Sequence, residues 1–366
     1  MATGEHRVRL KAILTEMDGL FEHFFTWLDD QYDPDTGGFF YARSSKESGK
    51  FTPDIESTAQ ALNILQRVGM LEEWNPAYKE KAIRFFQNKQ DAASGYFYDE
   101  DPNMRADDVM VGRAISYSSN ALRQLGGRPL YPLPDPFRDA PAYMRSPKDY
   151  AAWLESIELS NSWRGCDRLC NSAPYLRQMD AEARKPYLEE ALRFFERIQD
   201  PETGLWGEGS WYVRISGTFK LHTFYGTFNV PMPRPEAMYR SILYTLRNEQ
   251  AIDMCYIRNP INLLSSMNAQ VPEAEMEEIA SITLRNMKAL LRPDGGFSRE
   301  LAHSPVAPNV AQVKEGEFYP DMPKPVPLGL GLIEGDMNAG TQAVLIRTQC
   351  YELAGLQAPP LVLVNS

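Results

Sequence analysis

A short unit recurs along the chain and constrains the fold more than any other feature. In each copy an amphipathic helical pattern ends in Gln or Arg, and an acidic or proline-containing turn, a Gly and an aromatic residue follow. Four copies are visible, at Trp27–Phe40, Phe85–Phe97, Phe194–Trp206 and Asn286–Phe297. Asp and Pro favour the turn, and Gly supplies the positive φ required after a helix C-terminus. Intervals near one or two periods of roughly 50 residues predict a series of similar helical hairpins.

Two kinds of helix alternate between these turns. The charge-rich amphipathic kind is predicted at Val8–Asp30, Pro76–Lys89, Pro147–Ile157, Ala181–Ile198, Pro235–Asn248 and Glu273–Leu291. The kind rich in small and apolar residues is predicted at Thr52–Val68, Asp107–Gly126, Ser160–Arg177, about Ser216–Phe228, Asn259–Ala269 and Asn338–Ala354. Amphipathic helices suit an outer ring with one wet face, and apolar helices suit an inner ring packed on both sides.

Six such pairs predict an all-α fold, an (α/α)6 toroid of six inner and six outer helices that forms one domain over residues 1–366. An open helical solenoid is the alternative. Closure explains better why the units stop at six and why no polar capping repeat is evident.

Charge and hydropathy limit the partners. The formal net charge is −11 and the basic residues are dispersed, so nucleic acid and an anionic membrane surface are not expected as partners. A polyanionic substrate is disfavoured too, unless a local basic pocket overrides the overall sign. The sequence has neither a window of about 18 apolar residues nor an apolar signal core, which predicts no transmembrane segment and a cytoplasmic protein.

The cysteines and histidines do not indicate a metal site or a disulfide framework. Cys166 and Cys170 could share a helical face, but two further zinc ligands are not near in sequence. Buried thiols are the favoured interpretation, with no cofactor and no metal expected. The sequence leaves the oligomeric state open.

The Gln–turn–Gly–aromatic unit resembles the QW repeat of terpenoid cyclases and protein prenyltransferases, a toroid superfamily whose relatives include some polysaccharide lyases and hydrolases. Asp54 and the pair Thr58-Ala59 match parts of the Asp-x-Asp-Asp-Thr-Ala motif of class II terpene cyclases. Glu56 stands at the position of that motif's proton donor, and Ser57 replaces its last Asp. The resemblance implies a proton-donating role for Glu56. The same segment also has the composition of an ordinary helix start.

Acidic residues precede inner helices that are neighbours in a closed ring. Closure would bring Asp54 and Glu56 near Glu334, Asp336 and Asn338, at a pocket mouth. A pair of opposed carboxyl groups can catalyse glycosidic hydrolysis, in which one protonates the leaving oxygen and the other activates water or attacks the sugar. Helix capping is the alternative role, and it is the favoured one for Asp107 and Asp108.

A second constellation points to β-elimination. Lys220 and His222 lie in an apolar inner helix, and Tyr225 follows three residues after the histidine, on the same face. Tyr or His can abstract a proton next to a uronate carboxylate that an amide or a cation neutralises. Asn161 and Arg164 of the third inner helix are candidate neutralising groups. The alternative is a core histidine whose hydrogen bonds are satisfied.

Aromatic residues make up 11% of the chain, and several lie in the loops after the Gly turns. Tyr41 and Trp211 are candidates for stacking on a sugar or stabilising a carbocation. Structural packing of the repeat is the favoured interpretation of Trp206.

The sequence therefore predicts a carbohydrate-active enzyme that binds a small molecule or oligosaccharide and cleaves a glycosidic linkage, with hydrolysis preferred over elimination. The predicted catalytic residues are Asp54, Glu56, Asp336, His222 and Tyr225. The first alternative is a class II terpene-cyclase-like enzyme with Glu56 as proton donor. The second is a non-catalytic toroid that binds a glycan or a peptide.

Overall fold

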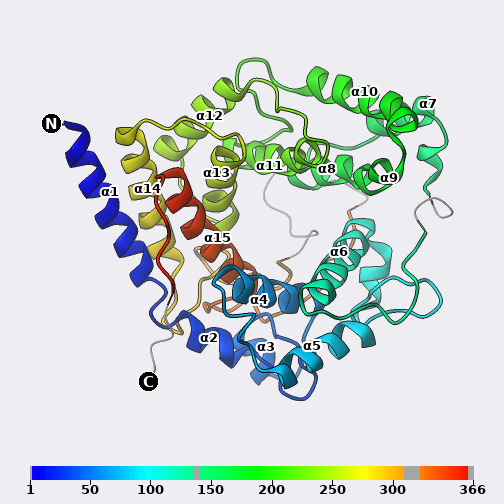
Figure 1. The fold of residues 1–366 in the computed structure, drawn as a ribbon, viewed down its shortest axis with the longest axis horizontal. Coiled ribbons are helices and arrows are strands. Elements are labelled where there is room, and N and C mark those ends of the chain that lie inside the picture. Colours follow the sequence, from blue (N-terminus) through cyan, green and yellow to red (C-terminus); the bar gives the residue numbers. More distant parts are fainter. Residues whose placement is uncertain (1, 136–139, 309–321, 362–366) are drawn as a thin grey trace.

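The computed structural model describes residues 2–135, 140–308 and 322–361, which form a ring of helices (Figure 1). Across these ranges the regular elements are α-helices and short 3-10 helices, and paired extended backbone is limited to isolated bridges. The prediction of an all-α fold is confirmed.

Six helical segments form the inner ring. They are α4 (Ile55–Arg67), α6 (Asp108–Gln124), α8 (Ser162–Leu169) with its continuation through η3 (Cys170–Ser172) and α9 (Ala173–Gln178), α11 (Trp211–Thr227), α13 (Met254–Ser266) and α15 (Met337–Leu353). Successive inner helices pack together from α8 through α11, α13, α15 and α4 to α6. Between α6 and α8, a buried ion pair joins Asp107 to Arg164.

The outer ring consists of α1 (Ala2–Gly19) with α2 (Phe24–Asp30), α5 (Pro76–Asn88), α7 (Pro147–Glu155), α10 (Ala181–Ile198), α12 (Pro235–Asn248) and α14 (Glu273–Leu290). The short α3 (Arg43–Glu47), η1 (Pro102–Ala106) and η2 (Ala142–Met144) lie in the connections. Helix α10 buries Tyr187, Ala191, Phe194 and Phe195 on one stripe and leaves its other face wet. Helix α15 has buried residues on most sides, as an inner helix requires.

The ring closes between the two ends of the chain. Helix α1 packs against α14, and α4 packs beside α15 (Figure 1). An antiparallel bridge joins Ala42 to Asp336, and the Asp18 carboxylate accepts hydrogen bonds from Arg347 Nε at 2.6 Å and the Tyr351 hydroxyl at 2.7 Å. These contacts confirm the predicted (α/α)6 toroid and exclude the open solenoid.

The recurrent turn joins neighbouring units, as the sequence indicated. Gln199 at the end of α10 donates from Nε2 to the Gly204 carbonyl at 2.8 Å and to the Pro233 carbonyl at 3.1 Å, which links two connections. Gly204 has a φ of 69°, a conformation that favours glycine. Trp206 is buried, and its Nε1 donates to the Phe195 carbonyl at 2.7 Å, which confirms its structural packing.

Several helix bounds differ from the predicted ones. The first outer helix begins at Ala2 and is divided into α1 and α2, and the third inner helix is divided by η3. Helix α4 begins three residues after its predicted start, and α11 and α13 begin five residues before theirs. The predicted start at Asn259 was wrong, because Asp253 caps α13 and Pro260 lies inside the helix.

Candidate active site

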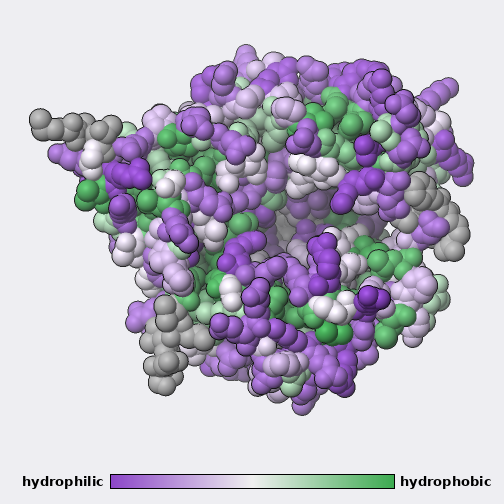
Figure 2. All heavy atoms as spheres, in the orientation of Figure 1, coloured by the Kyte–Doolittle hydropathy of each residue, from purple (hydrophilic) through white to green (hydrophobic). Residues whose placement is uncertain are grey.

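A pocket of about 300 Å³ lies at the centre of the ring, and all six inner helices contribute to its wall. Figure 2 shows that the molecule is hollowed at its centre and that hydrophilic residues gather around the opening. The cations that line the pocket are Arg67, Arg113, Lys220, Arg258 and Arg299. The other polar or aromatic lining residues include Gln60, Asn63, Tyr117, Trp163, Asp167, Phe219, Asn338 and Gln342. Within the described part of the chain, Asp167 is the single carboxylate of this lining. The pocket is therefore cationic in a protein of net charge −11.

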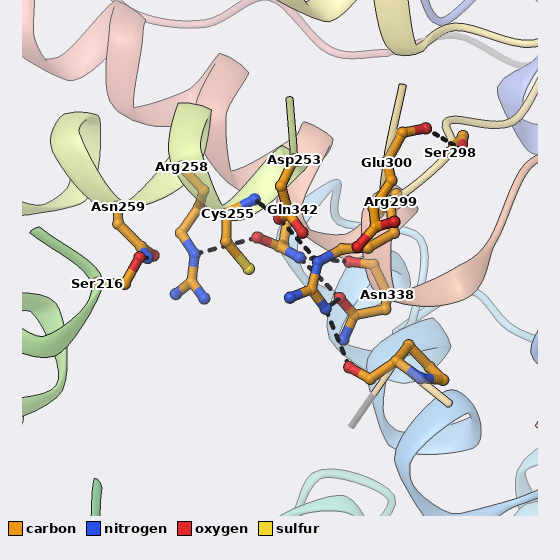
Figure 3. A network of polar contacts seen from close by, with 12 residues as sticks. Ser216, Asp253, Cys255, Arg258, Asn259, Ser298, Arg299, Glu300, Asn338 and Gln342 are labelled. Atoms are coloured by element: carbon orange, nitrogen blue, oxygen red, sulfur yellow. Dashed lines mark hydrogen bonds and ion pairs between the residues drawn. The ribbon is translucent and has the colours of Figure 1, made fainter. Parts of the chain in front are cut away.

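Arg258 presents its guanidinium to this pocket. Its Nε donates to Gln342 Oε1 at 3.4 Å, and its Cζ lies 4.0 Å from the centroid of the Phe219 ring. Cys255 is a further side-chain partner of Arg258, and Figure 3 shows the two terminal nitrogens directed away from Gln342. Burial lowers the pKa of Arg258, because the desolvated cation lacks a carboxylate partner within the described ranges.

A network of hydrogen bonds holds Arg258 in place (Figure 3). Gln342 Nε2 donates to Asn338 Oδ1 at 2.8 Å, and the same oxygen accepts a bond of 2.8 Å from Arg299 Nη1. Arg299 Nε in turn donates to the buried Asp253 carboxylate at 2.8 Å. The Arg258 side chain is thus anchored through its Nε atom.

Lys220 and Asp167 form a second polar group of the pocket. Their Nζ and Oδ1 atoms are 3.2 Å apart, and Nζ lies 4.2 Å from the centroid of the Trp163 ring. Burial lowers the pKa of Lys220. The second carboxylate oxygen of Asp167, Oδ2, is buried and has no hydrogen-bond partner in the described structure. The Asp167 side chain as a whole is 19% accessible and lines the pocket, so its carboxylate can contact a ligand.

Arg113 of α6 links the Glu56 carboxylate of α4 to the Tyr117 hydroxyl of its own helix. Its Nη2 donates to Glu56 Oε1 at 2.6 Å and to the Tyr117 hydroxyl at 3.2 Å. Burial lowers the pKa of Arg113, but Glu56, Tyr117 and Asp167 together outweigh burial, and the pKa is raised. Burial raises the pKa of Tyr117, so its hydroxyl is protonated at neutral pH and can donate a proton.

Three of the residues predicted from sequence reach this region. Lys220 and Asn338 line the pocket, and Glu56 contacts its wall through Arg113 and through Gln60 Nε2 at 3.1 Å. They come from three different inner helices, α11, α15 and α4, which the closed ring brings together.

The other predicted acids lie at helix starts outside the pocket lining. Asp54 caps α4 by accepting the Ser57 N–H at 2.8 Å, and Asp336 caps α15 by accepting the Ala339 N–H at 2.8 Å. Burial raises the pKa of Asp54 to about 8, with a further contribution from the neighbouring Asp99 carboxylate. Burial raises the pKa of Asp336 to about 6.

Two further predicted residues belong to the closure between the first and sixth units. Glu334 accepts a hydrogen bond of 2.9 Å from the Ser44 N–H. Tyr41 is buried, and its carbonyl accepts the Met337 N–H at 2.8 Å. The geometry thus assigns these residues structural contacts, and their roles in catalysis or substrate binding stay predictions.

His222 and Tyr225 are not brought together at the pocket. The His222 Nδ1 is paired with the Phe219 carbonyl of its own helix, and burial lowers the pKa of the ring. Tyr225 is buried against Trp206 and Phe195, with ring centroids 5.9 and 6.2 Å apart. Tyr225 therefore faces the outer ring. The predicted His/Tyr pair has no support from this arrangement.

The remaining predicted residues also have contacts away from the pocket lining. Asn161 caps α8 by accepting the Arg164 N–H at 2.9 Å. Arg164 donates from both terminal nitrogens to the Asp107 carboxylate, at 2.8 and 3.2 Å. Trp211 packs on Tyr244 of the outer helix α12, with ring centroids 5.0 Å apart.

Sequence reasoning missed most of the pocket. Arg113, Tyr117, Trp163, Asp167 and Arg258 were not predicted as site residues. The available signal was a polar side chain inside an otherwise apolar inner helix, as at Arg258 between Ile257 and Asn259. On a helix that is buried on most sides, such a residue needs a polar cavity or a partner.

Neither a metal cluster nor a membrane span is present in the described ranges. They contain no group of three or more His, Cys, Asp or Glu side chains suited to a metal ion, and Cys166 and Cys170 are free thiols. None of their helices combines the length and the hydropathy needed to cross a bilayer.

Comparison with known proteins relates the chain to solved structures. No protein-family model and no curated protein sequence matches it. A protein from Actinoplanes aligns with 94% of this chain and 99% of its own, at 13% identity and a TM-score of 0.44. A type II terpene cyclase variant from Scytonema, in complex with geranylgeranyl dihydroxybenzoate, aligns over 94% and 99% at 12% identity and a TM-score of 0.46. A polysaccharide lyase aligns over 96% and 98% at 12% identity and a TM-score of 0.42. These similarities concern the path of the chain and carry no assignment of residues or activity.

Proposed function

We propose that the chain is a carbohydrate-active enzyme that cleaves a glycosidic linkage in an anionic oligosaccharide bound in the central pocket. The observation that carries this proposal is the cationic lining, above all Arg258, whose guanidinium has no carboxylate partner among the described residues. A planar guanidinium suits bidentate recognition of a carboxylate, and a desolvated cation gains most from such a partner.

The charge of the pocket favours an acidic sugar over a neutral one. Glu56 is paired with Arg113, Asp167 with Lys220, and Asp253 with Arg299. Arg258 has no carboxylate partner in the described structure, so a uronate carboxylate would neutralise it. The local basic pocket reverses the expectation from net charge that a polyanionic substrate is disfavoured.

The same groups support β-elimination from a uronide. Arg258 and Lys220 would stabilise the negative charge that develops on the substrate carboxylate as the neighbouring C–H bond breaks. An oxygen of the Asp167 carboxylate would take that proton, and the electron pair of the C–H bond would form the ring double bond as the glycosidic C–O bond breaks. The Tyr117 hydroxyl would protonate the departing oxygen. The products are an unsaturated uronide and a shortened saccharide, without added water.

Hydrolysis, which the sequence favoured, is the second candidate. The same Asp167 oxygen could take a proton from water while Tyr117 protonates the leaving group. The pocket lining in the described ranges holds one carboxylate rather than an opposed pair, and this favours elimination.

The pocket lends less support to the terpene-cyclase alternative. A polyprenyl substrate would require a wall dominated by aromatic and aliphatic groups, whereas cations and amides line much of this one. Glu56, the expected proton donor, is paired with Arg113. The non-catalytic alternative requires that no saccharide is turned over, which an activity assay decides.

The test is a panel of uronate, sulfated and neutral oligosaccharides incubated with the purified protein, with products identified by mass spectrometry. The proposal predicts cleavage of an acidic member, with one product lighter by one water than its hydrolytic counterpart. We expect Asp167→Asn to abolish turnover while substrate still binds. A product that contains added water would support hydrolysis, and no cleavage of any member at high enzyme concentration would contradict the proposal.

A further inference from the structure

A groove continues from the central pocket between α4 and α6. It has a volume of about 430 Å³ and shares Asn63, Arg113 and Tyr117 with the pocket. Beyond these three, Ser116, Asn120 and Gln124 of α6 line it. From Arg113 to Gln124 the helix rises about 16 Å, so the groove extends well beyond the pocket along the wall of the ring.

The chemistry of the groove differs from that of the pocket. Its described lining has hydroxyl and amide groups and contains no carboxylate, with Ala59 and Ala121 between them. Ser116 and Asn120 are exposed, so their polar groups are accessible to a ligand. The one additional cation, Arg123, is exposed and donates from Nη2 to Asn120 Oδ1 at 2.9 Å. Hydroxyls and amides match the donors and acceptors of an uncharged sugar.

One residue shared by the two cavities is Tyr117, to which the proposed chemistry assigns the leaving oxygen. Tyr117 and Arg113 lie where the groove meets the pocket, and their side chains are joined by a hydrogen bond of 3.2 Å. A saccharide that places its acidic unit against Arg258 and its linkage at Tyr117 would continue into the α4–α6 groove.

We propose that this groove is a subsite for an uncharged sugar unit adjacent to the acidic unit, so that the substrate contains both kinds of unit. This inference rests on the proposed function. It predicts that oligosaccharides in which a uronate alternates with an uncharged N-acetylhexosamine are better substrates than uniformly acidic oligouronates of equal length.

The experiment compares wild type with Ser116→Phe, which fills the groove from an exposed position, and with Asn120→Ala, which removes an amide. The control is Asn248→Ala on the exposed face of α12. We expect both groove variants to lower kcat/KM for an alternating tetrasaccharide by about tenfold, the effect of one lost hydrogen-bonded contact, and the value for an oligouronate of equal length to stay within about twofold. The control should match wild type.

Equal losses for both saccharides, or no loss for the alternating tetrasaccharide, would overturn the subsite. Calorimetric binding of the same two saccharides to Asp167→Asn, with and without Ser116→Phe, separates the two proposals because it does not depend on turnover. Tighter binding of the alternating tetrasaccharide without any cleavage by wild type would support the groove and contradict the catalytic proposal. Equal binding of the two saccharides would contradict the groove alone, and absence of binding would contradict both.

Discussion

Arg113 of α6 and Glu56 of α4 form an ion pair, with Nη2 and Oε1 2.6 Å apart, at the wall of the central pocket. Glu56 thereby fixes a guanidinium that also donates to Tyr117. We expect Glu56→Gln to lower kcat on an acidic oligosaccharide by about tenfold, because Arg113 and Tyr117 lose their alignment. KM should not rise, because the variant removes a negative charge near an anionic ligand.

Steady-state kinetics with Glu56→Gln and Glu56→Asp check this positioning role. The conservative aspartate should restore part of kcat. A matched control is Glu80→Gln, which breaks an exposed pair with Arg84 on the outer helix α5. A higher KM with unchanged kcat would contradict the positioning role. Cyclisation of a polyprenyl substrate that Glu56→Gln abolishes would instead support the cyclase alternative.

Asp54 makes the stability of the fold dependent on pH. Its carboxyl has a pKa of about 8 in the folded chain, against about 4 for an exposed Asp, because burial disfavours the charge. The folded state therefore holds a proton that the unfolded state releases between these values. The contribution of protonated Asp54 to the free energy of unfolding is fully present below pH 4 and is lost as the pH rises towards 8.

Asp54→Asn should flatten this dependence. Asn is an equally good N-cap and cannot ionise, so the Ser57 N–H keeps its acceptor. Urea unfolding of the variant and wild type at several pH values between 4 and 9 measures the effect. The variant should be the more stable protein at the alkaline end. Parallel pH profiles for the two proteins would contradict the raised pKa.

Asp107, unlike Asp54, is a helix cap whose carboxylate has a buried cationic partner. Its carboxylate accepts the Val109 N–H at 3.1 Å and is paired with the buried Arg164 between α6 and α8. Asp107→Asn keeps the cap but leaves a buried guanidinium without its counter-charge, which costs about 3 kcal/mol or more of unfolding free energy. Urea unfolding at pH 7 checks the value, with Asp54→Asn as the matched cap variant. Equal stabilities for the two variants would contradict this contrast.

The ring could be predicted from sequence because its signals are local. The Gln, Gly and aromatic positions at Gln199, Gly204 and Trp206 each report a specific turn contact, and they recur. The alternation of charge-rich and apolar helices predicts an outer ring of charge-rich helices and an inner ring of apolar helices. Some predicted helix bounds were wrong, as for α13, which begins before its predicted start and contains Pro260 in its interior.

The pocket could not be predicted in the same way, because its residues come from six separate helices and from the connection between α14 and α15. Arg258 is one cation in an apolar helix, and its role follows only once ring closure places α15 and Gln342 beside it. Acids at helix starts gave the more visible pattern. For Asp54 and Asp336 the backbone N–H groups of their own helices are the partners that the structure provides.

The comparison that tests the central claim most directly is the turnover of an acidic oligosaccharide and its neutral isostere by wild type, Arg258→Ala and Arg258→Lys. We expect wild type to cleave the acidic substrate and not the neutral one. Arg258→Ala should lower kcat/KM by about a hundredfold, which corresponds to the loss of a charged hydrogen-bonded pair, and Arg258→Lys should recover part of it because it keeps the charge but loses the fork. Equal turnover of acidic and neutral substrates, or an Arg258→Ala variant as active as wild type, would contradict the assignment of the central pocket to an anionic sugar.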